Sequence, residues 1–408
     1  MTNNYRNDFP FFSNEKNKGI IYFDNAATAQ RPRRVIDAIA HFYEENNANP
    51  LRGLYDLSVR ATEAYEAARH TVARFINAAE DAEVIFTRNA SESLNLIAYT
   101  YGTANIREGD EIAVSIMEHH SNILPWQMVA KAKGAKLVYL ECDKESGVIS
   151  DEEIAAKIGE RTKLVAVAHV SNVLGITNDI AKIAKAAHEA GAVIVVDGAQ
   201  AVPHIKTDVR ALGADFYAFS AHKLTGPTGC GVLYGKKSLL EAMPPFLRGG
   251  EMIEYVTRED ATWAPIPAKF EAGTVNAGGA VGLEAAVKYI ELIGYDYITA
   301  HDNALASRLI EGMKEIPHVR VIGNPDGMRH CGIVTFTIDG VHPHDIATVL
   351  DTERIAIRAG HHCAQPLGSY LGVPATARAS VYFYNTEEEV DVFLSKVKNI
   401  RSWMGFKD

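Results

Sequence analysis

The sequence predicts an α/β protein with a mostly parallel central sheet in a large domain and a smaller α+β domain toward the C-terminus. From Val84 to Tyr234, short and nearly continuous apolar runs alternate with amphipathic helical patterns, as in parallel sheets covered on both faces. After about residue 300 the pattern changes to a helix, a strand over 333–338 and a last helix from Thr386. A chain of 408 residues is long enough for two such domains.

The first part of the chain is typical of a loose arm followed by two helices. Residues 1–20 are polar apart from three phenylalanines, Phe9, Phe11 and Phe12, through which we expect the arm to dock. Apolar spacing then predicts, in order, a strand over 20–23, a helix over 32–45, a loop over 46–57 and a helix over 58–76. The loop is a candidate rim of an active site.

The central part supplies the strands of the predicted sheet. These strands are 84–87, 112–115, 136–140, 164–168, 192–196, 216–220 and 231–234. Helices are expected over 91–101 and 179–190, a loop-rich segment over 245–280 and a helix over 282–293. We divide the chain into an arm (1–20) that joins the small domain, a large domain (21–295) and a small C-terminal domain (296–408).

Composition and charge exclude several classes of protein. The formal net charge of -10 is spread along the chain and basic residues form no long run, so a nucleic-acid partner is not expected. No apolar run approaches the roughly 20 residues that cross a bilayer, and the start of the chain lacks the pattern of a secretory signal. Four cysteines without a CxxC pair do not form a disulfide framework. We expect a cytoplasmic protein without a membrane partner.

One stretch, 216–234, predicts a strand, a polar turn and a second strand, with Lys223 in the turn. A lysine held between two buried strands has a lowered pKa and an amine free for Schiff-base chemistry. The alternative is a solvated lysine at the tip of a hairpin, and this stretch alone does not decide between the two.

A second residue gives Lys223 a partner. Asp197 closes the strand over 192–196, at the edge where ligands bind in parallel sheets. An aspartate that keeps a pyridine nitrogen protonated and a lysine that holds an aldehyde as an imine are the two fixed points of a pyridoxal 5'-phosphate site. The segment from Asn89 to Glu92 opens a helix, whose free N–H groups suit a phosphate.

Seven motifs then carry a resemblance that covers nearly the whole chain. They are FDNAAT (23–28), MEHHSNILPW (117–126), VSNVLG (170–175), VDGAQ (196–200), SAHKLTGPTG (220–229), FEAGTVN (270–276) and RAGHHCAQP (358–366). With these motifs the chain resembles the fold-type I pyridoxal phosphate enzymes of the class V aminotransferase family, and within it the SufS-type (group II) cysteine desulfurases. The resemblance implies a homodimer, L-cysteine as substrate, and sulfur supplied for iron–sulfur cluster assembly.

The resemblance also implies a role for each matching residue. Lys223 would hold the cofactor, Asp197 would pair with its ring nitrogen, Gln200 would bind its phenolic oxygen, and His120 would stack on the ring and move protons. The phosphate would be bound by Ser91, with Ala90 beside it, by Ser220 and His222, and by Thr274 of the neighbouring subunit. The substrate carboxylate would be bound by Asn172, Arg358 and Arg378, since a guanidinium grips a carboxylate bidentately.

Cys363 decides the subfamily. Gly360 permits a tight turn before it, and two adjoining histidines can favour the thiolate. In the family this thiolate takes the sulfur of L-cysteine as a persulfide and alanine is released. The alternative for any single cysteine is a buried small hydrophobe, which we expect for Cys142, Cys230 and Cys331.

Several alternatives stay open at this point. A selenocysteine lyase, a lyase that releases free sulfide, and a non-catalytic scaffold of a cluster-assembly complex share much of the pattern. The histidines at 342, 344, 361 and 362 are taken as structural, without a metal. The segment VHPHD (341–345) resembles the stretch by which some relatives engage a SufU-type sulfur acceptor. A SufE-like acceptor is the other possibility. The chain departs from many relatives by Ala90-Ser91 in place of a threonine pair, and by Leu51 in place of a histidine.

Overall fold

The structure is a computed structural model that describes residues 4–324 and 326–407. Within these residues the larger sheet has seven strands in the order β2-β8-β7-β6-β5-β3-β4. Their bounds are β2 Val84–Thr87, β3 Glu111–Ser115, β4 Lys136–Leu140, β5 Thr162–Ala168, β6 Val193–Asp197, β7 Phe216–Ser220 and β8 Gly231–Gly235. β7, β6, β5, β3 and β4 are paired in parallel, and β8 is antiparallel to both neighbours. The predicted mostly parallel sheet is confirmed.

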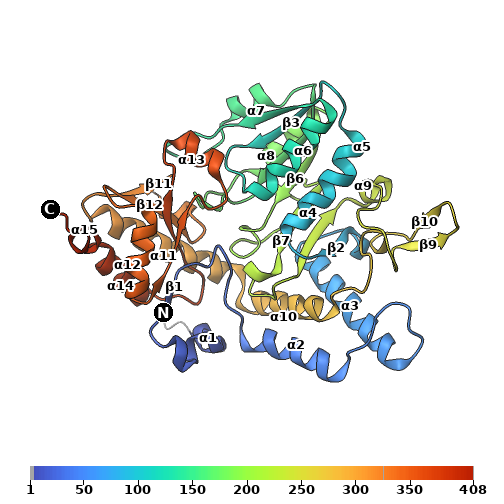
Figure 1. Cartoon of the computed structure of the whole chain (residues 1–408), viewed down its shortest axis with the longest axis horizontal. Coiled ribbons are helices and arrows are strands. Elements are labelled where there is room, and N and C mark those ends of the chain that lie inside the picture. The colour runs from blue at the N-terminus through green and yellow to red at the C-terminus, as the bar shows by residue number, and fades with distance from the viewer. Residues whose placement is uncertain (1–3, 325, 408) are drawn as a thin grey trace.

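Both faces of this sheet are buried, because alternate side chains of its strands enter two different apolar clusters. Val165 and Val167 of β5 belong to one cluster, and Leu164 and Ala166 to the other. The first face is covered by α3 Asp56–Phe75, α7 Asp151–Lys157, α8 Ile180–Glu189 and α10 Ala277–Ile293. The second is covered by α4 Ala90–Ile97 and α6 Leu124–Lys133. Helices lie on both sides of the sheet (Figure 1), so its two faces are closed and only the ends of its strands are open to a ligand.

The C-terminal part forms a second, antiparallel sheet in the order β11-β12-β15-β14. Its strands are β11 Val319–Ile322, β12 Ile333–Ile338, β14 Arg358–Gly360 and β15 Thr376–Ser380. The helices of this part are α11 Tyr295–Lys314, α12 Pro343–Thr352, α13 Gln365–Leu371, α14 Glu387–Val397 and α15 Ile400–Trp403. The last long helix begins after Thr386, as predicted, with a capping box between Thr386 and Glu389.

Residues 21–24, where the predicted large domain starts, pack against the C-terminal part. Strand β1 Ile21–Tyr22 pairs in parallel with β13 Ile355–Ala356 in a two-stranded sheet of its own, and Asp24 forms a bridge with Ser380. Ile21 and Phe23 join the apolar cluster of the C-terminal part. The arm that precedes them docks through Phe9, which is fully buried and packs 4.4 Å from the ring centroid of Tyr384.

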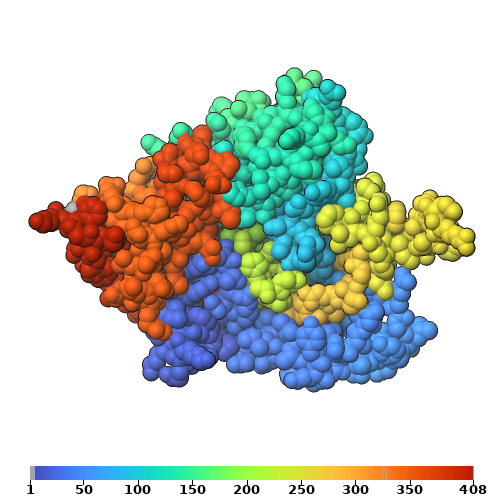
Figure 2. Space-filling view, in the orientation of Figure 1, coloured from blue at the N-terminus to red at the C-terminus, as the bar shows by residue number. Residues whose placement is uncertain are grey.

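Two further segments differ from the sequence-based prediction. The loop-rich segment contains a hairpin, β9 Ile253–Val256 and β10 Ala261–Trp263, which stands out from the body of the molecule (Figure 2). α10 begins at Ala277, five residues before the predicted start. The remaining helices are α1 Pro10–Ser13, α2 Arg33–Glu45, α5 Thr103–Asn105 and α9 Lys237–Ala242, with a π turn η4 over Ala98–Gly102 between α4 and α5.

Candidate active site

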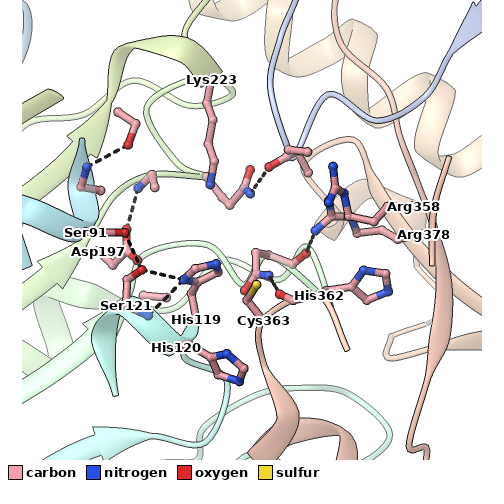
Figure 3. A pocket seen from close by; sticks show the side chains of 18 of the residues that line it. Ser91, His119, His120, Ser121, Asp197, Lys223, Arg358, His362, Cys363 and Arg378 are labelled. Carbon is pink, nitrogen blue, oxygen red and sulfur yellow. Dashed lines mark hydrogen bonds between the residues drawn. The ribbon is translucent and has the colours of Figure 1, made fainter. Parts of the chain in front are cut away.

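A cavity of about 650 Å³ lies between the two sheets. Asp197 and Lys223 reach it from the carboxyl ends of the large sheet, where ligands of such sheets bind. Arg358, Cys363 and Arg378 reach it from the C-terminal part. Side chains as far apart in the sequence as Ser91 and Arg378 thus face one space (Figure 3).

Lys223 follows β7 in a single 3-10 turn, η6 Ala221–Lys223, and points into the cavity (Figure 3). Burial lowers the pKa of its amine from 10.5 to about 8, Asp197 raises it, and Arg378 lowers it. A pKa of this size leaves a usable fraction of neutral amine near neutral pH. The alternative of a solvated lysine at a hairpin tip is wrong.

Asp197 is the last residue of β6 and is 7% exposed. Its Oδ1 accepts a hydrogen bond from the Ala199 N–H at 2.9 Å. Burial raises the pKa of the carboxyl, while Lys223 and the Ala199 N–H lower it. The carboxylate thus has one protein donor and a cation nearby, and it can accept from a protonated ring nitrogen.

The N-terminus of α4 closes one end of the cavity. The Ala90 N–H donates to Ser220 Oγ at 2.8 Å, and the Glu92 N–H to Asn89 Oδ1 at 2.9 Å. The side chain of Ser91 lines the cavity and its Oγ lies 2.6 Å from Ser121 Oγ. His222, whose pKa is lowered to about 4 by burial and then by Lys223, lines the same cavity. This end brings together the hydroxyl groups of Ser91, Ser121 and Ser220 at the positive end of a helix, which suits an anion.

Gln200 also lines the cavity and has unused hydrogen-bonding capacity. Its Nε2 donates to Ala26 O at 2.8 Å, which uses one of two hydrogens. Its Oε1 is buried and has no hydrogen-bond partner among the described residues. An unpaired buried polar atom is costly, so this amide is suited to a polar group inside the cavity.

Of the two histidines in the turn after β3, His119 rather than His120 is oriented toward Lys223. The pKa of His119 is lowered to about 3 by burial and then by Lys223. His120 lies further out (Figure 3), its Nε2 accepts from the Gln365 N–H at 3.2 Å, and its pKa is lowered by burial and by His361. The sequence prediction assigned the ring-stacking position to His120, and the structure favours His119 because only its ring lies beside the lysine.

Two arginines share one carboxylate in the cavity wall. Arg358 donates to both oxygens of Asp24, at 3.1 and 2.8 Å, and Arg378 lies 3.5 Å from Asp24 Oδ1. Arg378 is 3% exposed, and its Nε has no hydrogen-bond partner among the described residues. Burial lowers the pKa of Arg378 to about 10, Asp24 raises it and Arg358 lowers it. Sequence reasoning missed Asp24, for which FDNAAT was the available signal.

Asn172 is engaged in a different way from the prediction. Its side-chain N–H group donates to the backbone carbonyl of His362 at 2.7 Å. The backbone carbonyl of Asn172 accepts from Arg378 Nη1 at 2.8 Å. Asn172 therefore fixes the cysteine loop and Arg378 in this structure, and it lines the cavity at the same time.

Cys363 lies exposed at the mouth of the cavity. The loop that carries it is strained, because His362 and Cys363 both have positive φ, +49° and +57°. The loop is tethered to the large sheet by the His120 N–H, which donates to Cys363 O at 2.7 Å. The other three cysteines are free and buried, as predicted, and burial raises the pKa of Cys142 to about 11.

Thr274 is exposed and does not line the cavity of its own chain. The loop that carries it is anchored by Glu271, whose two oxygens accept from Arg69 at 2.8 Å each. Both side chains of this ion pair are almost fully buried, at 2% and 4% exposed. The Tyr65 hydroxyl and the Phe86 N–H also donate to Glu271. Thr274 is thus presented on a firmly held loop at the surface.

The described residues contain no group of three or more His, Cys, Asp or Glu side chains placed to hold a metal ion. Among the same residues, no helix is both long and apolar enough to cross a membrane.

Comparison with known proteins identifies the family. The chain matches the family described as "Aminotransferase class-V" over residues 21–393. The chain belongs to the class V aminotransferase family. A "Probable cysteine desulfurase" of Halalkalibacterium halodurans is 50% identical over 398 residues, 97% of each chain. One of Staphylococcus epidermidis is 49% identical over 98% of this chain and 97% of its own.

Solved structures agree with this family assignment. An apo cysteine desulfurase from Thermococcus onnurineus has a TM-score of 0.94 and 41% identity, over 99% of this chain and 98% of its own. The Escherichia coli cysteine desulfurase CsdA has a TM-score of 0.90 and 39% identity, over 98% of both chains. The predicted fold-type I class V aminotransferase fold and the resemblance to cysteine desulfurases are confirmed.

The cofactor of this family is pyridoxal 5'-phosphate, and the cavity fits it. Lys223 supplies an amine of lowered pKa, and Asp197 a buried carboxylate. The amide of Gln200 has a second Nε2 hydrogen beyond the one given to Ala26 O, and the α4 end offers hydroxyl groups. These are the partners that an aldehyde, a ring nitrogen, a phenolic oxygen and a phosphate need.

Proposed function

We propose that this protein is a cysteine desulfurase that converts L-cysteine to L-alanine and keeps the sulfur as a persulfide on Cys363. The observation that carries the proposal is the exposed Cys363 thiol at the mouth of the cavity that holds Lys223. An aminotransferase of the same fold has no use for a thiol there. The tether between Cys363 and the His120 N–H supports a defined position for the loop.

Five residues would hold the cofactor. Lys223 would bind its aldehyde, Asp197 its ring nitrogen and Gln200 its phenolic oxygen, and Ser91 and Ser220 its phosphate. His222 lies next to this phosphate end. When bound, the cofactor supplies an electron sink that makes the α-hydrogen and the β-sulfur of an amino acid labile. Lys223 Nζ, with a pKa near 8 in the free protein, can then take up or release a proton at neutral pH.

His119 is the better candidate for the residue over the cofactor ring. Its Nδ1 accepts from the Ser121 N–H at 3.1 Å, and a pKa of about 3 keeps the imidazole neutral. The single ring proton therefore resides on Nε2. His119 would act as a donor from Nε2, while His120 would hold the cysteine loop.

Arg358 and Arg378 would bind the substrate carboxylate. Arg378 has an unpaired Nε among the described residues, and Arg358 is partly exposed and points into the cavity. Guanidinium groups suit a carboxylate because they donate two parallel hydrogen bonds. Asn172 would support this subsite by holding Arg378 through its carbonyl.

The sulfur transfer is balanced without an added oxidant. The Cys363 thiolate attacks the substrate sulfur and a sulfur–sulfur bond forms. The carbon–sulfur bond of the substrate breaks, its electron pair stays with carbon, and that carbon takes up a proton. One L-cysteine and one thiol thus give one L-alanine and one persulfide.

The assembly and the acceptor are part of the same proposal. We propose a cytoplasmic homodimer of the SufS type, in which Thr274 reaches the phosphate of the partner subunit. A second copy would cover apolar side chains that this chain leaves exposed, among them Leu54, Tyr55, Leu247, Tyr255 and Val256. The persulfide would pass to a SufU- or SufE-like acceptor for iron–sulfur cluster assembly.

The test is alanine and sulfide release from L-cysteine with a reductant. Wild type and a Cys142→Ala control should release alanine, because Cys142 is buried away from the cavity. Cys363→Ala should release little. Equal alanine from wild type and Cys363→Ala would refute Cys363 as the sulfur acceptor and leave a lyase that ejects sulfide directly. A wild type without alanine release in the presence of candidate acceptor proteins would refute the desulfurase itself.

A further inference from the structure

A chain of hydrogen bonds joins the α4 end of the cavity to His119 through Ser121. Ser91 Oγ lies 2.6 Å from Ser121 Oγ, and Ser121 Oγ lies 3.0 Å from His119 Nδ1 (Figure 3). All three side chains line the cavity. Ser121 was not among the residues that the sequence singled out, and nothing described so far gives its hydroxyl a role.

The direction of this chain follows from one backbone group. The Ser121 N–H is a donor that cannot accept, and it points at His119 Nδ1. Nδ1 is therefore an acceptor, so the Ser121 hydroxyl must donate to it. The Ser121 oxygen then accepts from the Ser91 hydroxyl. In this arrangement the Ser91 proton is directed at Ser121, away from any ligand.

A phosphate at Ser91 changes the count of donors and acceptors. The anion needs the Ser91 proton, so the Ser91 hydroxyl turns toward the anion. The Ser91 and Ser121 oxygens, 2.6 Å apart, then have no hydrogen between them. That contact is stable only if one of them donates to the other. The Ser121 hydroxyl can turn to Ser91, because His119 Nδ1 keeps the Ser121 N–H as its donor.

We propose that Ser121 is a positioning residue for the cofactor phosphate, acting through Ser91. Its hydroxyl donates to Ser91 when the phosphate is bound and to His119 when it is not. Position 90 is alanine and adds no hydroxyl at this end, so the Ser91–Ser121 pair supplies the polar contact on that side. This inference rests on the proposed cofactor site and names a residue that deepens it.

The test measures retention of pyridoxal 5'-phosphate by the holoenzyme, from the loss of its visible absorption band during dialysis at a series of free cofactor concentrations. Ser121→Ala should weaken retention about fivefold, the effect of one neutral hydrogen bond. Ser91→Ala should weaken it more. The double variant should retain cofactor as Ser91→Ala does, because Ser121 acts only through Ser91.

A residue with a merely structural role would give a different pattern. The double variant would then lose retention by the product of the two single-variant factors, and that outcome overturns the proposal. Unchanged retention in Ser121→Ala overturns it as well. Ser121→Thr and Ser121→Val form a matched pair of equal shape, of which only threonine should retain cofactor like wild type; equal retention by the two is a third refuting result.

The same measurements separate this inference from the proposed function. Cofactor retention requires no L-cysteine, so the pattern among the variants can be read in a protein without desulfurase activity. Conversely, alanine release by wild type stands whatever the outcome at Ser121.

Discussion

The lowered pKa of Lys223 predicts how the cofactor-free protein takes up its cofactor. Only a neutral amine attacks an aldehyde. With a pKa of about 8 rather than 10.5, the neutral fraction at pH 7 is about 9% instead of about 0.03%, a gain of roughly 300-fold. The apoprotein should therefore bind pyridoxal 5'-phosphate covalently at neutral pH, with a rate that is half-maximal near pH 8 and reaches its plateau above that pH.

Two variants test the direction in which each charged neighbour shifts the pKa of Lys223. Asp197 raises the pKa of Lys223 and Arg378 lowers it. Asp197→Asn should therefore move the midpoint of the pH–rate profile to lower pH, and Arg378→Met should move it to higher pH. The assay is stopped-flow absorbance of the lysine-bound cofactor after apoprotein is mixed with excess cofactor between pH 6 and 10. Free cofactor ionises in the same range, so the displacement between proteins is the measured quantity.

Two results would refute the reasoning. A wild-type midpoint near 10.5 would mean that burial in this cavity does not disfavour the ammonium form. Displacements of equal sign in the two variants would mean that a general change of the site, rather than the charge of each neighbour, sets the pKa.

Two other predictions concern the loop that carries Thr274. Glu271→Ala removes the buried carboxylate that pairs with Arg69 and accepts from Tyr65 and Phe86, and it leaves Arg69 only the half-exposed Glu66 as an ionic partner. It should therefore lower the free energy of unfolding in urea by about 3 kcal/mol. Glu291→Ala, which breaks an exposed ion pair, is the control and should cost about 1 kcal/mol or less. A loss for Glu271→Ala no larger than the control's would contradict the buried geometry. Mixing Lys223→Ala chains with Thr274→Ala chains and allowing exchange should raise alanine release above that of either variant, since each hybrid dimer has one intact site if Thr274 acts across the interface. Activity that stays at the mean of the two variants would place Thr274 outside the site.

Local patterns predicted the large sheet because its strands are buried on both faces. The bounds of β2, β4 and β7 agree with the prediction to the residue. Such strands need continuous apolar runs, which a sequence displays directly. The hairpin β9–β10 was not predicted because its strands are only four and three residues long and most of their side chains are exposed.

Three glycines explain why the sequence predicted the start of α10 too late. Gly278, Gly279 and Gly282 lower helix propensity, so the sequence placed the start of the helix at 282. In the structure a Cβ on Gly278 would lie 2.8 Å from the ring of Tyr43, and one on Gly282 would lie 2.7 Å from Ile39. The glycines are there for close packing of α10 on α2, and that tertiary requirement overrides propensity.

Within the site, the family motifs were sufficient to name most of the residues that face the cavity. They could not choose between His119 and His120, which are adjacent and chemically identical. The choice depends on the turn after β3, where the Ser121 N–H holds the ring of His119 and the N–H of Gln365 holds that of His120. Strand β1 was predicted, but its pairing with β13 was not, because that partner lies more than 330 residues away in the sequence.

The charges at the proposed carboxylate subsite account for two arginines and one aspartate held together there. Without substrate, Asp24 gives both guanidinium groups a partner, which buried cations need. The cluster still has two positive charges and one negative charge, and Arg358 lowers the pKa of Arg378 accordingly. A substrate carboxylate brings the sum to zero, whereas an uncharged analogue leaves the excess positive charge in place. The proposed subsite would therefore favour an amino acid with a free carboxylate without requiring Asp24 to leave.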